Sequence, residues 1–159
     1  AIHLLPDKAH VLQEVRQALN RDGVLGFNTS FYEGCYAAGT DRFYKLWMLR
    51  SLQLLKREHG LKPDRSRAQA MQWLTPAQYR ELLEQHGFEI EAMETEPAMM
   101  TCRSWQDISQ YSDFAEGALP GVPLDVAVPI LQRSVAQAYD ELAIDELPRN
   151  WLQVVARAV

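Results

Sequence analysis

Side chains able to do chemistry gather at two places, each at the end of an apolar run typical of a buried strand. His3 lies in the run at residues 1–5, and Asn28 and Ser30 follow the run at residues 24–27. Ligands of open α/β sheets bind beyond the carboxyl ends of the strands, so both places are candidate ligand sites. The imidazole of His3 could act as a general base near neutral pH, or it could only pack at the start of a helix.

The loop that follows the second run combines aromatic rings with glycines. It contains Phe31, Tyr32 and Tyr36, and its acid is Glu33. Aromatic side chains with a polar handle on a glycine-hinged loop suit a lid over an apolar or aromatic substrate, although they could equally anchor the loop to the core. Glu33 could accept a proton from a substrate, or it could lie in solvent. Trp47, in a predicted helix, is a candidate for substrate contact or for core packing.

The composition argues against several other kinds of site. Cys35 and Cys102 are far apart and have no evident histidine partner, and the four histidines lack metal-ligand spacing, so we expect no metal site and no disulfide. Two isolated cysteines favour a reducing cytoplasm. A net charge of −5 argues against a nucleic-acid partner and against an anionic membrane surface. No apolar stretch reaches the roughly 20 residues that cross a bilayer.

Hydrophobic periodicity predicts alternating strands and helices. Such alternation predicts an α/β fold with a mainly parallel sheet and helices on both faces. The last strand has no simple crossover before it, so we expect it to be antiparallel. Pro97 should interrupt the strand expected at residues 88–95, at an edge or a bulge, and residues 98–103 could resume it. The expected helices cover residues 6–20, 40–59, 75–86, 104–118 and 124–142, the last bent or restarted at Pro129, and the expected strands cover residues 1–5, 24–27, 88–95 and 151–158.

The length of 159 residues predicts one domain, or part of one, over residues 1–159. Residues 104–147 are longer than a simple hairpin connection needs, so we expect them to form a helical insert. That insert could cap a substrate pocket or offer a surface to a partner. The run at residues 1–5 predicts the end of a buried strand, and such a strand needs neighbours on both sides. We therefore interpret the chain as the second half of a larger fold.

The order of these elements, joined to four short stretches, resembles the C-terminal half of a class I S-adenosylmethionine-dependent methyltransferase. Residues 1–7, which read AIHLLPD, resemble the end of the family's fourth strand and the start of the next helix. Residues 11–25 are similar to that helix, its turn and the fifth strand, although only Gly23 remains of the family's proline-glycine turn. Residues 74–88 are similar to the helix and turn before the sixth strand, and residues 149–156 to the seventh strand.

The resemblance implies a Rossmann-like three-layer sandwich, here the C-terminal half of a seven-stranded, mainly parallel sheet with an antiparallel last strand. It implies S-adenosylmethionine as cofactor, with Ile2 and His3 near its methionine part, and substrate contact at Asn28 and Ser30. The glycine-rich turn that cradles the cofactor in this family does not occur in the sequence, and we expect it before Ala1. The chain alone should therefore bind the cofactor weakly or not at all.

The leading expectation is the substrate-side half of a methyltransferase that acts on a small, apolar or aromatic molecule. The alternative is a non-catalytic split or degenerate module that binds a protein partner or an apolar ligand. We expect an open sheet edge to pair with the missing N-terminal half or with a second copy of the chain. The expected substrate contacts are Asn28, Ser30, Phe31, Tyr32, Tyr36 and Trp47, and the candidates for proton transfer are His3 and Glu33.

Overall fold

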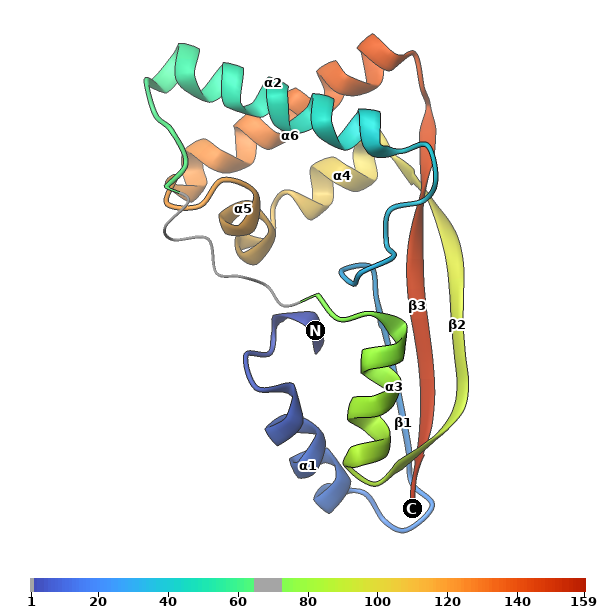
Figure 1. The fold of residues 1–159 in the computed structure, drawn as a ribbon. Coiled ribbons are helices and arrows are strands. Elements are labelled where there is room, and N and C mark those ends of the chain that lie inside the picture. The colour runs from blue at the N-terminus through green and yellow to red at the C-terminus, as the bar shows by residue number, and fades with distance from the viewer. Residues whose placement is uncertain (1, 65–72) are drawn as a thin grey trace. The chain divides into compact units, whose positions relative to one another are not determined.

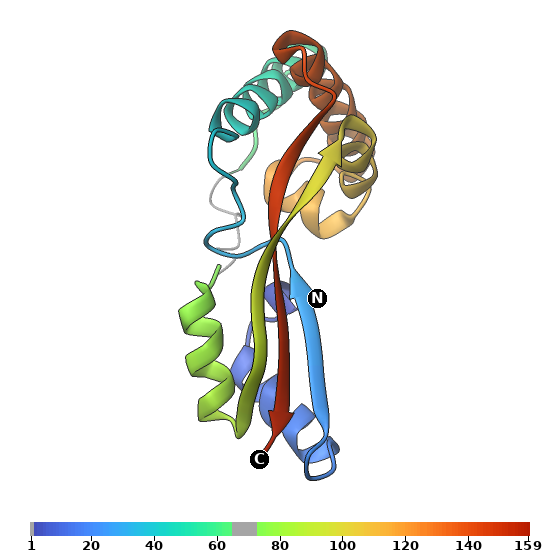
Figure 2. The same cartoon turned by 90° about the vertical axis from the view of Figure 1, so that its right-hand side faces the viewer.

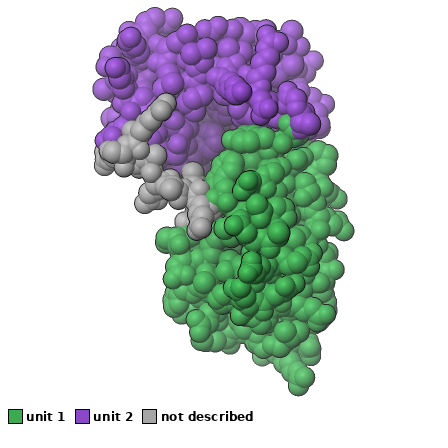
Figure 3. Space-filling view, viewed as in Figure 1, with its two compact units in different colours: residues 1–37, 71–98, 149–159 green, residues 38–70, 99–148 purple. Residues whose placement is uncertain are grey.

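The computed structural model describes residues 2–64 and 73–159, which form two compact units (Figure 3). Unit 1 draws on the ranges 1–37, 71–98 and 149–159, and unit 2 on the ranges 38–70 and 99–148. The expected insert at residues 104–147 lies within unit 2, which also contains the helix predicted at residues 40–59. The two long strands, at residues 88–101 and 146–158, each contribute residues to both units.

Unit 1 is built on a three-stranded sheet of β1 (Val24–Thr29), β2 (Phe88–Thr101) and β3 (Glu146–Ala158) in the order β1-β3-β2. In the antiparallel pair β1–β3, Val24 lies opposite Arg157 and Thr29 opposite Leu152. The arrows of β1 and β2 run opposite to that of β3 (Figure 2). The prediction of an antiparallel last strand is therefore confirmed.

Two helices cover one face of this sheet in unit 1, α1 (Lys8–Ala18) and α3 (Pro76–Gln85) (Figure 1). The Asp7 carboxylate caps α1 by accepting the His10 N–H at 2.8 Å. Helix α3 begins with a capping box, in which Thr75 and Gln78 exchange hydrogen bonds. The buried core between helices and sheet consists of Leu12, Tyr32, Cys35, Leu74, Tyr79, Leu83, Phe88, Leu152, Val154, Ala156 and Ala158.

The α/β class is confirmed, but its finer details differ from the expectation. The described residues form three strands with antiparallel pairing, not a mainly parallel sheet, and the helices of unit 1 lie on one face instead of two. The other face is polar, because Gln153 and Arg157 of β3 bond there to Glu96 and Glu91 of β2. An antiparallel sheet can leave one face in water, which a parallel sheet rarely does.

Several element boundaries also differ. Ile2–Leu4 form a 3-10 helix, η1, so the expected strand end at residues 1–5 is wrong for the described residues. Strand β2 continues through Pro97 to Thr101, because it is an edge strand and a missing N–H can face away from the ladder. The single helix expected at residues 104–118 is two helices, α4 (Cys102–Ile108) and α5 (Ser112–Ala118).

Unit 2 is a helical unit in which α2 (Asp41–His59) packs along α6 (Leu124–Leu142) (Figure 1). Two ion pairs join the helices, Arg50 with Glu141 and Arg133 with Glu58. Helix α6 runs through Pro129 without a restart. No helix in the described part of the chain is both long and apolar enough to cross a membrane. The buried rings and aliphatic side chains at the centre of the unit include Phe43, Trp47, Leu55, Trp105, Ile130, Leu131, Val135 and Tyr139.

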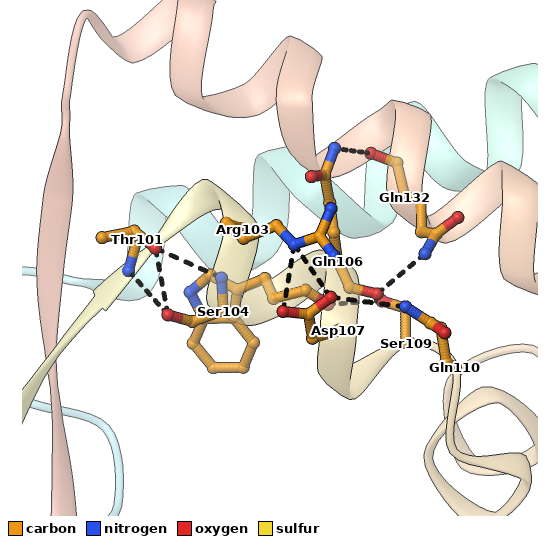
Figure 4. Close-up of polar contacts among 9 residues, drawn as sticks. Thr101, Arg103, Ser104, Gln106, Asp107, Ser109, Gln110 and Gln132 are labelled. Carbon is orange, nitrogen blue, oxygen red and sulfur yellow. Dashed lines mark hydrogen bonds and ion pairs between the residues drawn. The ribbon is translucent and has the colours of Figure 1, made fainter.

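Helix α4 is fixed to α6 by an exchange of amide hydrogen bonds (Figure 4). The side-chain amide of Gln132 donates to the Gln106 carbonyl at 2.9 Å, and that of Gln106 donates to the Gln132 carbonyl at 3.4 Å. A capping box between Thr101 and Ser104 starts the helix at Cys102, two residues earlier than expected. Local hydrogen bonding therefore decides where β2 ends.

Two neighbouring valines of β3 test the sheet packing. Val154 is 1% exposed and Val155 is 36% exposed, on opposite faces. We expect Val154→Ala to lower the free energy of unfolding by about 2 kcal/mol, through lost burial and a cavity. Val155→Ala, the matched control, should cost less than about 1 kcal/mol. Urea unfolding of both variants measures the difference, and equal losses would contradict the assigned faces.

Tyr79 should make the protein sensitive to alkaline pH. Burial raises the pKa of its phenol to about 12, and its hydroxyl has no hydrogen-bond partner among the described residues. The unfolded chain loses this proton near pH 10, so the contribution to stability is complete below pH 10 and is lost as the pH rises toward 12. Tyr79→Phe should be at least as stable at pH 7 and should unfold less readily than the parent above pH 10.

Tyr139→Phe is the matched comparison for loss of a buried hydroxyl at pH 7. The Tyr139 hydroxyl is also buried, but it donates to the Met100 carbonyl at 2.6 Å. Its removal should cost about 1 kcal/mol at pH 7, where removal of the Tyr79 hydroxyl costs nothing. Urea unfolding at pH 7 separates the two hydroxyls. Burial raises the pKa of Tyr139 as well, so the pH dependence is tested by the parent and Tyr79→Phe at pH 7, 9 and 11. Parallel pH curves for the parent and Tyr79→Phe would show that Tyr79 does not contribute.

Candidate functional site

The residues best placed for chemistry lie at the carboxyl end of β1 in unit 1. Six side chains are joined there by ring contacts, by a hydrogen bond to a hydroxyl and by contacts with a guanidinium. We call this cluster the β1-end site. Its side chains come from η1, from β1 and the loop after it, from the segment before α3, and from β3. The β1-end site consists of His3, Thr29, Phe31, Tyr36, Trp73 and Arg149.

A hydroxyl holds the imidazole of His3 in this site. Its Nδ1 lies 3.1 Å from Oγ1 of Thr29, a residue that is 2% exposed. The same Oγ1 accepts the backbone N–H of Phe31 at 3.0 Å, which turns the chain out of the strand. The imidazole also packs on the Phe31 ring, with centroids 4.5 Å apart. In the tautomer whose Nδ1–H donates to Thr29, the Nε2 atom keeps the lone pair that a general base requires.

Arg149 is the buried charge of the site. It is 2% exposed, and it donates to the Ser30 carbonyl from Nε at 3.0 Å and from Nη2 at 2.5 Å. Its guanidinium carbon lies 5.1 Å from the centroid of the Phe31 ring and 5.4 Å from that of Tyr36. Both distances are within the range of a cation–π interaction. One guanidinium therefore orients two rings of the loop and one of its carbonyls.

The start of β3 holds the rest of the loop at residues 31–36. The Asn150 backbone N–H donates to the Cys35 carbonyl at 2.9 Å, and its side-chain amide donates to the Gly34 carbonyl at 3.0 Å. On the other side, the Glu33 N–H donates to the Leu74 carbonyl at 3.0 Å. These bonds fix the loop backbone against β3 and the segment before α3.

The structure brings some of the predicted site residues together and separates others. His3 and Phe31 are in contact, and Tyr36 joins them through Trp73, whose ring centroid lies 6.2 Å from that of Phe31 and 5.8 Å from that of Tyr36. Ser30 contributes its backbone carbonyl.

The other predicted residues have different surroundings. Ile2 is half-buried against the core of unit 1, and Tyr32 is 1% exposed within that core. Asn28 and Glu33 are exposed. Trp47 lies in the core of unit 2, where its indole N–H donates to the Leu131 carbonyl at 3.0 Å.

Sequence reasoning missed Arg149 and Trp73. Arg149 precedes a predicted strand, and no sequence signal distinguishes it from the half-buried Arg157 of the same strand. Trp73 follows residues 61–72, whose sequence predicts an exposed connection and carries no signal of a site. Both reach the site through folding, because Arg149 and Ser30 are 119 residues apart in the chain. Only the pairing of β3 with β1 brings them within hydrogen-bonding distance.

Thiol chemistry is disfavoured at the site. Burial raises the pKa of the Cys35 thiol, and the nearby Arg149 charge opposes that shift only in part. Cys35 is 0% exposed, so the neutral thiol acts as a small apolar core residue. Among residues 2–64 and 73–159, no group of three or more histidine, cysteine, aspartate or glutamate side chains is arranged to hold a metal ion.

Comparisons with known proteins bear on the fold. No protein-family model matches the chain, and no curated protein matches it. A solved structure from Bacillus halodurans C-125, described as a "putative methyltransferase", aligns with a TM-score of 0.50 at 13% sequence identity. The alignment covers 99% of this chain and 60% of that one, so this chain spans about three fifths of the length of its structural neighbour. At this identity the similarity shows a methyltransferase-like α/β fold.

Two arginines of β3 test the role of the buried charge. We expect Arg149→Met to lower the free energy of unfolding by about 2–3 kcal/mol, because the buried Ser30 carbonyl loses a charged donor. Arg157→Met is the matched control. Arg157 pairs with Glu91 at the surface, so its loss should cost less than about 1 kcal/mol. Similar losses in urea unfolding would contradict the anchoring role of Arg149.

Proposed function

We propose that the chain is the substrate-side half of an S-adenosylmethionine-dependent methyltransferase that acts on a small, apolar or aromatic molecule. The observation that carries the proposal is the cluster of rings around His3 and Arg149 at the carboxyl end of β1. Strand ends of this kind bind ligands in open α/β sheets. The methyltransferase-like fold supports the reaction class, although fold similarity alone would not assign it.

The described residues fit one end of the proposed cofactor. Ile2, His3 and Phe31 are half-buried near the β1 end, and such aliphatic and aromatic groups suit the methionine part. The chain does not contain a glycine-rich turn that could cradle the remainder of the molecule. When bound, S-adenosylmethionine supplies an electrophilic methyl group on sulfur. Ile2 and His3 would hold that end of it.

The residues of this chain would mainly orient the acceptor molecule. Methyl transfer is an in-line displacement, so much of its rate comes from proximity and alignment. Phe31, Tyr36 and Trp73 would fix the plane of the acceptor. Where the acceptor must lose a proton, His3 would take it, held in place by the hydroxyl of Thr29. Glu33 is the weaker candidate, because it is exposed.

A second function is a non-catalytic module that binds a protein partner. The observation that favours it is the outer edge of β1, because β1 pairs with β3 alone in the described part of the chain. An unpaired strand edge can accept a strand from another chain. We propose that this edge pairs with the rest of a larger protein or with a second copy of the chain. Pairing with a second copy would make the 159-residue chain a dimer or larger oligomer in solution.

Cofactor binding separates the two functions. Isothermal titration with S-adenosylmethionine should give a dissociation constant at least about tenfold weaker for the 159-residue chain than for the protein as its native host makes it. Intact mass and N-terminal sequencing of the host protein define that comparison. In the host protein, His3→Ala should weaken binding, and His10→Ala, at an exposed histidine of α1, should not.

The outcomes are distinct. No binding to either protein would overturn the methyltransferase proposal and leave the module, which light scattering should then show as an oligomer or a complex. A monomeric 159-residue chain would contradict pairing of the β1 edge with a second copy, and a host protein of the same length that is also monomeric would contradict pairing altogether. Equal binding by both proteins would show that the missing glycine-rich turn is not needed.

A further inference from the structure

Three rings of the β1-end site, those of Phe31, Tyr36 and Trp73, lie near one another and are partly accessible. Tyr36 is 47% exposed, and Phe31 and Trp73 are half-buried. Their centroids lie 6.2 Å apart for Phe31–Trp73 and 5.8 Å apart for Tyr36–Trp73. Three rings at these distances can place a further planar ring by stacking or by edge-to-face contact. The Tyr36 ring is thus open to solvent while its loop is held by backbone hydrogen bonds.

The buried guanidinium determines what kind of ring suits this surface. An aromatic face carries partial negative charge and attracts cations. The Arg149 guanidinium, which is 2% exposed, is already the cation that the Phe31 and Tyr36 rings attract, and it lies on their interior side. It draws π-electron density toward itself and makes the outer ring faces less negative. A second cation on the solvent side would lose this attraction and would also be repelled by the guanidinium charge.

We propose that the exposed surface of Tyr36 and Trp73, with Arg149 behind it, binds a neutral or anionic, electron-rich aromatic ring and rejects a cationic one. This inference rests on the proposed function and specifies its acceptor as a planar ring of the phenol or indole type. Electron density on such a ring is attracted by the positive charge behind Tyr36. The binding itself requires neither the cofactor nor the rest of a larger protein.

Three probes with related skeletons test the proposal on the 159-residue chain without cofactor. They are 2-naphthol, its saturated analogue decahydro-2-naphthol, and the cation 2-naphthyltrimethylammonium. Calorimetric titration, or ligand-observed NMR for weak binding, should give at least about tenfold tighter binding of 2-naphthol than of either other probe. A cation that binds as tightly as 2-naphthol would overturn the role of Arg149, and an equally bound saturated probe would overturn ring stacking.

A pair of tyrosine variants locates the binding. Tyr36→Leu should weaken 2-naphthol binding at least about tenfold, which corresponds to about 1.4 kcal/mol. Its exposure makes loss of folding a minor concern, and urea unfolding checks this directly. Tyr111→Leu is the control, because Tyr111 is 70% exposed and lies between α4 and α5 in unit 2. Unchanged binding by Tyr36→Leu, or an equal loss by Tyr111→Leu, would overturn the assignment.

The result is independent of the methyltransferase test. Selective binding of 2-naphthol without any cofactor binding by the host protein would support the aromatic site and refute methyl transfer. Cofactor binding by the host protein without selective ring binding would support the reaction class and refute this acceptor. The two failures are therefore distinguishable.

Discussion

The pairing of β3 with both β1 and β2 is the constraint on which unit 1 depends. The buried residues of β3 alternate with exposed ones, so its Leu152, Val154 and Ala156 face the helices while Gln153 and Arg157 face solvent. A shift of one residue in register would exchange these two sets. The same register places the start of β3 beside the loop that follows β1. The core and the candidate site therefore depend on one set of backbone hydrogen bonds.

Arg149 connects this register to the site. A buried charge is unfavourable unless hydrogen bonds and nearby polarisable groups compensate it. Here the Ser30 carbonyl accepts two bonds from the guanidinium, and the Phe31 and Tyr36 rings lie against it. These contacts fix the orientation of both rings. The contacts that compensate the buried charge are therefore the same contacts that orient the rings proposed to bind an aromatic acceptor.

Unit 2 is stabilised in a different manner. Its interior combines aromatic rings with a few satisfied hydroxyl groups, such as the Ser51 and Ser134 hydroxyls, whose oxygens are 2.6 Å apart. Trp47 belongs to this interior, with its N–H bonded to Leu131. Its size and burial are sufficient to explain its presence as a packing residue. The aromatic residues of the chain thus serve two purposes, and sequence alone does not separate them.

The sequence by itself determined the features that depend on neighbouring residues. The capping box of Thr75 and Gln78, the end of α2 at Gly60 with φ +65°, and the three strands all follow from local patterns. One predicted boundary was wrong for a local reason as well, because the capping box at Thr101 starts α4 at Cys102 and not at residue 104.

Only the tertiary structure decided which distant residues form the site. His3 meets Thr29 across 26 positions, and Arg149 meets Ser30 across 119. Neither contact can be predicted from local periodicity, because periodicity indicates which face of an element is buried and not which residues that face contacts. Strand order and register supply this information, and they arise from the packing of the whole unit. The chemistry of the site is therefore a property of the fold.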